Sequence, residues 1–433
     1  MQRDPAGRMR RRLLVVAAAG LFGLGVGVFW RPALAPIAGK PSFDTAPVVK
    51  GAQLAAVGDC AICHAGVDGQ AFAGGRPLET PFGQIYASNI TPDAETGIGT
   101  WSEAAFRRAM HEGVDAGGHF LYPAFPYNHF SHVSDDDVAA IYAFLMTRAP
   151  VHASAPETRL PFPFNIRLLM AGWDLLFVDH GGLQADPSKS PEWNRGRYLV
   201  EGLGHCQACH SPHNSLGAEE TSHAFEGGLI DGWEAPGLTA ATSPAAIAWT
   251  ADALFRYLRH GLDVQHAAAA GPMGVVSHDL SKVPEADVRA MAVYVAGMTG
   301  GADPARQQLV AARVAAAQIP PAALADSTGA TIFAGACAGC HGAGAQMMLN
   351  GRPSLALGSA VTADTPRNAA QVVLFGLQPQ AGESGPWMPG FANSLTDDQV
   401  AAVLSYLRAR FTDRPAWGDV EQGVRQIRQD KRS

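Results

Sequence analysis

The feature that most constrains this chain is the pattern Cys-x-x-Cys-His, which occurs three times, at residues 60–64, 206–210 and 337–341. On a helix, two cysteines at this spacing share a face, and the histidine follows directly. This is the attachment motif of c-type haem, with two thioether bonds and a proximal iron ligand from one short segment. The predicted thioether residues are Cys60, Cys63, Cys206, Cys209, Cys337 and Cys340, and the predicted proximal ligands are His64, His210 and His341.

The three motifs use all six cysteines of the chain, so none remains for a disulfide. The alternative use of such a pattern is a structural zinc site. A closed zinc site needs a second pair of Cys or His ligands close by, and no motif here has one. The sequence therefore predicts three haem c groups.

Similar segments surround each motif, which indicates a threefold repeat. Capped, amphipathic closing helices are expected at 134–145, 284–295 and 396–407. Each carries a tyrosine, and we interpret Tyr142, Tyr294 and Tyr406 as core residues. Opening helices are expected at 48–57, 193–203 and 327–335, and middle helices at 101–112, 249–260 and 368–377. The predicted fold is all-α, with three tandem cytochrome c domains, each wrapped around one covalently bound haem.

The predicted domain boundaries follow from these repeats. Between the domains lie one unusually apolar segment and one linker of small and polar residues. The expected parts are an export segment at 1–40, domain 1 at 41–155, an apolar interdomain segment at 156–190, domain 2 at 191–300, a linker at 301–325, domain 3 at 326–412 and a C-terminal tail at 413–433.

The N-terminus has the pattern of an exported protein. A basic stretch at residues 8–12 precedes an uncharged apolar run at 13–30. Ala33-Leu-Ala35 resembles a cleavage site, yet the run is also just long enough to span a bilayer. Residues 1–40 are therefore either a signal peptide or an N-terminal membrane anchor.

The interdomain segment contains an apolar stretch at 160–178 that is unusual for a linker facing solvent. We expect it to be covered. Packing between domains, a partner subunit and the membrane surface are the three possibilities.

The second axial ligand of each iron is expected in the loop before each closing helix, and a methionine there favours a high potential. Met273 and Met388 occupy this position in the second and third repeats. The first repeat has Phe125 instead, which cannot bind iron. His129 is the predicted ligand of the first iron. His119, His132, Met110 and a five-coordinate iron are the alternatives.

Several sequence patterns resemble the three-haem cytochrome c subunits of bacterial membrane-bound dehydrogenases. The resemblance covers most of the chain from about residue 48 to 411. It rests on SNITPD at 88–93, GIGTW at 97–101, HFLYPAFPY at 119–127, GRYLV at 196–200, HCQACHSP at 205–212 and GWEAPGLT at 232–239. Relatives that serve quinoprotein and flavoprotein dehydrogenases usually have methionine where this chain has Phe125. A loop with phenylalanine at position 125 is more similar to that of the cytochrome subunits that accompany molybdenum hydroxylases. Those enzymes oxidise aldehydes or N-heterocycles such as nicotinate.

The resemblance implies an electron-transfer subunit on the periplasmic side of the bacterial inner membrane, with membrane association. Its expected partner is a catalytic dehydrogenase subunit, either a molybdopterin hydroxylase with an iron–sulfur subunit or a quinoprotein or flavoprotein. Ubiquinone or a terminal oxidase is the expected acceptor, and no catalytic residue is expected. A net charge of −7 makes nucleic acid an unlikely type of partner.

Two alternatives remain at this point. In the first, the chain is a haem enzyme, peroxidase-like or thiosulfate-oxidising, and Phe125 marks an unusual first haem. In the second, residues 326–412 dock a soluble cytochrome.

Overall fold

The computed structural model describes residues 29–245, 247–300, 304–319, 321–345, 353–379 and 385–430. The chain divides into two compact units. Unit 1 holds the described residues up to Ala55 and those from Cys60 to Leu183. Unit 2 holds Ala56–Asp59 and the described residues from Gln184 onward. The second and third repeats therefore fold together as one unit.

The first repeat lies mainly in unit 1 and has the predicted helical order. Ser102 and Ser134 cap its middle and closing helices by accepting hydrogen bonds from Ala105 N and Asp137 N. Its elements are α2 (Thr45–Val57), α3 (Cys60–Cys63), β1 (Pro77–Thr80), β2 (Gly83–Tyr86), α4 (Glu103–Glu112), α5 (Tyr127–Phe130) and α6 (Asp135–Met146), and the apolar stretch that follows forms α7 (Leu169–Phe177).

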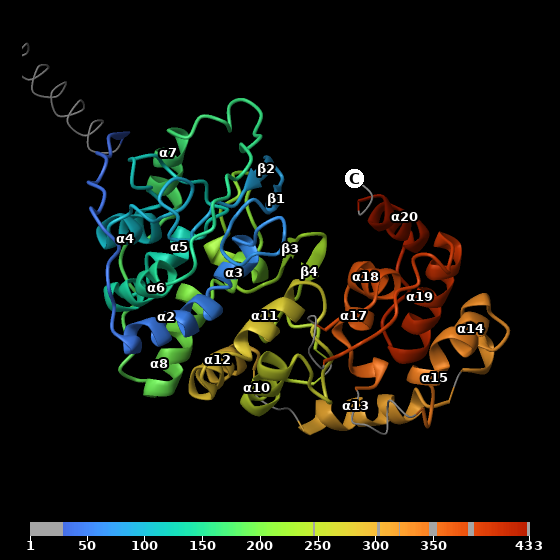
Figure 1. Cartoon of the computed structure of the whole chain (residues 1–433). Helices are drawn as coiled ribbons and strands as arrows, with labels where there is room; N and C mark the ends of the chain where they lie inside the picture. Colours follow the sequence, from blue (N-terminus) through green and yellow to red (C-terminus); the bar gives the residue numbers. More distant parts are fainter. Residues whose placement is uncertain are drawn as a thin grey trace, which may run out of the picture. The chain divides into compact units, whose positions relative to one another are not determined.

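The second repeat has the same order, and its opening helix α8 lies beside its closing helix α12 (Figure 1). Trp193 of α8 packs on Tyr294 of α12, with ring centroids 5.0 Å apart. The elements are α8 (Pro191–Arg197), the π-helix η1 (Tyr198–Leu203), α9 (Gln207–His210), η2 (Thr221–His223), β3 (Gly228–Ile230), β4 (Trp233–Ala235), α10 (Ala251–His260), α11 (Pro272–Leu280) and α12 (Glu285–Met298).

The third repeat is built around a core beneath its closing helix α19, with Val400, Val403 and Leu404 at the centre. Its elements are α13 (Pro304–Ala316), η3 (Ala322–Leu324), α14 (Thr328–Ile332), the π-helix η4 (Phe333–Cys337), α15 (Ala338–His341), η5 (Leu355–Leu357), α17 (Ser359–Thr362), α18 (Arg367–Phe375), α19 (Asp397–Phe411) and α20 (Val420–Asp430). Part of the predicted linker is thus the helix α13. The predicted tail contains α20, whose Val424 and Ile427 belong to the core.

In every repeat the opening helix crosses the closing helix at a glycine. A Cβ atom at Gly51, Gly196 or Gly329 would overlap the carbonyl oxygen of Ala140, Ala290 or Ala402, respectively. Glycine lets the two backbones touch, and an aromatic residue one turn later covers the crossing. These aromatics are Phe144, Tyr294 and Tyr406, so Phe144, rather than Tyr142, is the equivalent in the first repeat. All three predicted tyrosines are buried, as expected of core residues.

The fold is mostly helical rather than all-α, which corrects the sequence prediction. Among the described residues there are two antiparallel hairpins, β1–β2 and β3–β4. Their strands have three or four residues each, too few to produce a recognisable alternating pattern.

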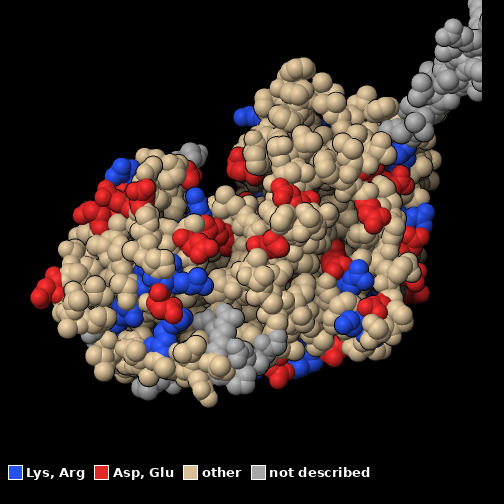
Figure 2. All heavy atoms as spheres, turned by 180° about the vertical axis from the view of Figure 1, so that it is seen from behind, with Lys and Arg blue, Asp and Glu red and all other residues tan. Residues whose placement is uncertain are grey.

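Charged residues of both signs are present on the face that Figure 2 shows. Figure 2 shows acidic and basic side chains interspersed on one face, with uncharged surface between them. Within the described ranges, no helix combines the length and the apolar character needed to cross a bilayer. The apolar run at 13–30 lies outside the described residues except for Phe29 and Trp30.

Candidate haem sites

Two of the predicted proximal histidines, His64 and His210, are oriented in the same way. Nδ1–H of His64 donates to the carbonyl oxygen of Ser88 at 2.6 Å, and Nδ1–H of His210 donates to that of Pro236 at 2.7 Å. Burial lowers the pKa of both imidazoles, which keeps them neutral. The Nε2 lone pair of each ring is then available to an iron, and the hydrogen bond at Nδ1 fixes the ring's tautomer.

The hairpins supply these hydrogen-bond acceptors. Ser88 and Pro236 come shortly after β2 and β4, respectively. The backbone also returns to the histidines, because Gly74 N donates to His64 O at 2.9 Å and Gly227 N donates to His210 O at 2.8 Å. Each hairpin therefore orients a predicted proximal ligand. Sequence reasoning missed this role because it missed the strands.

The backbone of the first two motifs is compatible with the predicted thioether attachment. His64 N donates to Cys60 O at 3.1 Å and His210 N donates to Cys206 O at 3.0 Å, so each of these two motifs is a helical turn. None of the six cysteines is in a disulfide. Burial raises the pKa of Cys206 to about 12 and that of Cys337 to about 11. Desolvation of the thiols is the main cause of both shifts.

A cavity of about 330 Å³ in unit 2 brings two of the motifs together. Its volume lies at the lower end of the range of small-molecule pockets. Most of the other residues that line it are apolar, as the face of a porphyrin requires. The second repeat contributes Cys209, His210 and Met273 to the wall, and the third contributes Cys337, Cys340, His341 and Met388. One continuous cavity therefore contains both predicted ligand pairs.

The two predicted methionines reach this cavity from defined elements. Met273 is in the first turn of α11. Met388 is held by a bridge to Leu377, with backbone hydrogen bonds of 3.0 Å in both directions. By contrast, Met291 is buried on α12, and it is not part of the cavity wall.

The register of the first two repeats identifies the residue that replaces methionine in the first. After the middle helices, Leu121 N donates to Gly113 O at 2.7 Å, and Ala269 N donates to Gly261 O at 2.8 Å. Counting onward from these matching bonds aligns Phe125 with Met273. The ring of Phe125 packs on Phe130, with centroids 5.2 Å apart. His129 follows on α5 and is buried, so it belongs to the interior next to this position.

The structure also shows the surroundings of two of the alternative ligands. His119 is exposed, and its ring nitrogen lies 3.0 Å from a carboxylate oxygen of Asp115. Met110 is a buried residue of α4. The neighbouring His111 donates a 2.9 Å hydrogen bond from Nε2–H to Val133 O, which ties α4 to the loop before α6.

Sequence reasoning also missed His266, which lines the cavity. Its ring stacks on Trp249 at a centroid distance of 3.5 Å. Nδ1–H donates to Asp263 at 2.8 Å, and Arg256 donates to the same carboxylate. The sequence contained only a weak indication of His266, because Trp249 and His266 belong to different segments and stack only in the folded chain.

Comparison with known proteins gives a consistent picture. The cytochrome c family model matches residues 48–149 and 327–410. The chain is 46% identical over 420 residues to one of the subunits of nicotinate dehydrogenase from Pseudomonas putida, covering 95% of this chain and 35% of that protein. It thus spans about a third of the length of that relative.

Two shorter relatives are matched over most of their length. The fructose dehydrogenase cytochrome subunit of Gluconobacter japonicus is 34% identical, over 88% of this chain and 82% of its own. The cytochrome c subunit of the alcohol dehydrogenase (quinone) of Gluconobacter oxydans is 32% identical, over 96% of this chain and 86% of its own.

Proposed function

Since this chain belongs to the cytochrome c subunits of membrane-bound dehydrogenases, and is thus an electron-transfer subunit of a dehydrogenase complex, we propose that it carries three haem c groups in series. The observation that carries the proposal is the cavity of unit 2, with one proximal histidine and one methionine from each of two repeats. Haem c, once bound, supplies a reversible one-electron couple at iron. The chain's own residues tether it, orient its ligands and exclude water.

The proposed axial pairs are His210 with Met273 and His341 with Met388. For the first iron, His64 is the proposed proximal ligand and His129 the proposed second ligand. Replacing His129 with alanine should then change the optical and spin-resonance signals of one haem only. Unchanged spectra would exclude His129 and leave His119, His132, Met110 or a five-coordinate iron.

The proposed electron donor is a molybdopterin hydroxylase with an iron–sulfur subunit. The identity with the nicotinate dehydrogenase relative and the Phe125 form of the loop at 119–127 both support this class. A quinoprotein or flavoprotein donor is the alternative, supported by the relatives from alcohol and fructose dehydrogenases.

The proposed location is the periplasmic side of the inner membrane, with ubiquinone or a terminal oxidase as acceptor. The export pattern at residues 8–30 supports the location. The name of the alcohol dehydrogenase relative, which includes quinone, supports the first of the two acceptors.

The test is to purify the chain with its co-expressed catalytic subunit from a host that attaches haem c. The mass of the chain should include three haems, and substrate of the dehydrogenase should reduce them only when both subunits are present. A colourless chain, or reduction by the substrate without the catalytic subunit, would contradict the proposal.

Phe125 at the methionine position is the one observation that favours a haem enzyme. In that case the isolated chain should turn over peroxide or thiosulfate and show a high-spin first haem. Three low-spin haems without such turnover would exclude this alternative.

A further inference from the structure

The stretch at 160–178 exposes large apolar side chains. Phe162 is 78% exposed, Leu175 72% and Leu176 70%. Ile166, Leu168 and Leu169 are exposed as well. A run of this kind, on contiguous chain, is uncommon on a soluble protein and marks a contact surface.

Helix α7 faces its charged side chain inward and its large apolar side chains outward, the reverse of an ordinary surface helix. Its one charged residue, Asp174, points inward, and a carboxylate oxygen lies 3.3 Å from Nε2 of His180. Ala171 and Trp173 are buried, while Leu175 and Leu176 face outward. A helix in water places its charges outside. The outward face of α7 is therefore built for an apolar environment.

This exposure is not the result of a loose segment. Arg167 donates from Nη1 to Phe120 O at 3.1 Å and lies over the ring of Tyr122 at 4.7 Å. Ala171 and Met170 pack in a small core with Val114 and Phe120. The fold holds the apolar side chains outward.

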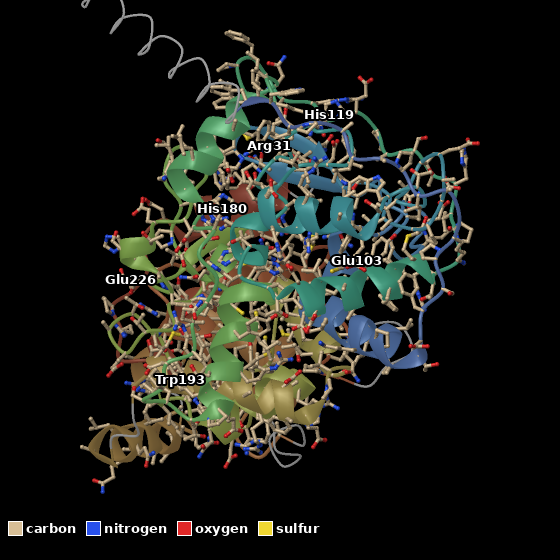
Figure 3. All side chains as sticks on the ribbon, turned by 90° about the vertical axis from the view of Figure 1, so that its left-hand side faces the viewer. Arg31, Glu103, His119, His180, Trp193 and Glu226 are labelled. Atoms are coloured by element: carbon tan, nitrogen blue, oxygen red, sulfur yellow. The ribbon has the colours of Figure 1, made fainter. Side chains whose placement is uncertain are left out.

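The N-terminal end of the described chain lies near Phe120 and Asp174, which also contact the 160–178 stretch or belong to it. Leu34 N donates to Ala116 O at 2.9 Å, and the guanidinium of Arg31 lies 5.9 Å from the ring of Phe120. Arg31 and His180 lie close to α7 in Figure 3, and both interact electrostatically with Asp174. We use the name outer apolar face for the exposed large apolar side chains of these two segments, which are Phe29, Trp30, Phe162, Ile166, Leu168, Leu169, Leu175 and Leu176.

The chain that precedes this face indicates what covers it. Residues 13–28 are uncharged and apolar, so the polypeptide arrives at Phe29 from a segment suited to lipid. Tryptophan at the junction, followed by Arg31, is typical of the boundary between lipid and water. Helix α7 has nine residues and is about 14 Å long, less than half the hydrocarbon thickness of a bilayer. A helix of this length can contact a bilayer along its surface but cannot cross it.

We propose that the outer apolar face is a membrane-contact surface, inserted into the headgroup and acyl boundary of a bilayer beside the N-terminal segment. The face would hold unit 1 against the membrane independently of any anchor. It gives the electron-transfer subunit a defined orientation toward an acceptor dissolved in the lipid.

The first test measures binding of the haem-loaded full chain to vesicles of phosphatidylethanolamine and phosphatidylglycerol. The double variant Leu175→Glu/Leu176→Glu should weaken partitioning at least about tenfold. The matched control is Leu309→Glu/Ile319→Glu, since these side chains are 69% and 76% exposed in unit 2. It should bind as the parent does. Equal binding by both variants would overturn the proposal.

A second test does not depend on disruptive changes. Because the haems occupy all six cysteines, Leu176→Cys gives a single reactive thiol for a nitroxide label. Added vesicles should raise the label's collisions with oxygen and lower those with a water-soluble nickel complex. A label at Ile319→Cys should not respond. Shielding of position 176 by the catalytic subunit alone, with no response to vesicles, would show instead that the face binds protein.

These outcomes are separate from those that test electron transfer. In detergent, the Leu175→Glu/Leu176→Glu variant should still be reduced by the catalytic subunit at the parent rate. Loss of that reduction would contradict the proposal, because it would assign the face to the electron donor.

Discussion

The hydrogen bond to Nδ1 is the detail that makes His64 and His210 suitable iron ligands. A backbone carbonyl accepts from each ring, so neither depends on a titrating partner for its orientation. The sequence showed the histidines but not these acceptors, because Ser88 and Pro236 are distant in the chain and are brought close only by the hairpins.

At the same scale, Met273 and Met291 form a matched pair for testing the ligand assignment. Replacing Met273 with leucine should abolish the methionine–iron charge-transfer absorption of one haem and lower its potential or make it high-spin. Leucine conserves the volume, so the fold should be retained.

The control is Met291→Leu, which changes a buried methionine of α12 away from the cavity. Its spectra should match those of the parent. A change in Met291→Leu but not in Met273→Leu would exclude Met273 as the ligand.

Asp263 gives a pH-dependent prediction. Burial alone raises its pKa, but hydrogen bonds from His266, Gln265 and Arg256 outweigh burial, and the pKa lies below the usual value of 3.8. A lowered folded pKa means that the carboxylate contributes stability above its unfolded pKa, and that the contribution is lost as pH falls through the folded pKa. Asp263→Asn should therefore lower stability by about 2 kcal/mol at pH 7, and less in acid.

Thermal unfolding at several pH values measures this difference. The control is Asp252→Asn, which removes an exposed ion pair with Arg289 and should leave Tm unchanged. A constant destabilisation of Asp263→Asn at all pH values would show that the carboxylate charge is not the cause.

At the scale of elements, each repeat depends on the close crossing of its opening helix and its closing helix. Gly329→Ala places a methyl group against Ala402 O and Tyr406 Cβ. The helices must separate, at a cost of about 1–3 kcal/mol. Chemical denaturation of the haem-loaded protein, followed by far-ultraviolet circular dichroism, measures this loss.

Gly335→Ala is the matched control, because nothing lies within 4 Å of a Cβ there. It should be neutral or slightly stabilising, since alanine is favoured in a helix. If the two variants were equally stable, the close crossing of α14 and α19 would be refuted.

At the scale of the whole molecule, the shared cavity of unit 2 predicts that the two haems proposed there influence each other. Cys337→Ser/Cys340→Ser removes the attachment of the third haem. The spin-resonance signal of the second haem should then sharpen, because a nearby paramagnetic iron no longer broadens it. A second-haem signal identical in parent and variant would indicate that the two irons do not interact.

Local patterns in the sequence predicted the candidate attachment cysteines, the proximal histidines and the two methionine ligands. They also determined the closing helices, although the predicted side-chain cap is missing from α12, whose N-cap residue is Pro284. Each is encoded within a few residues. Only the tertiary structure decided that the second and third repeats share one unit and one cavity, that hairpins orient His64 and His210, and that Asp174 turns inward beneath an exposed apolar face. These features depend on contacts between distant segments, and such contacts form only when the chain has folded.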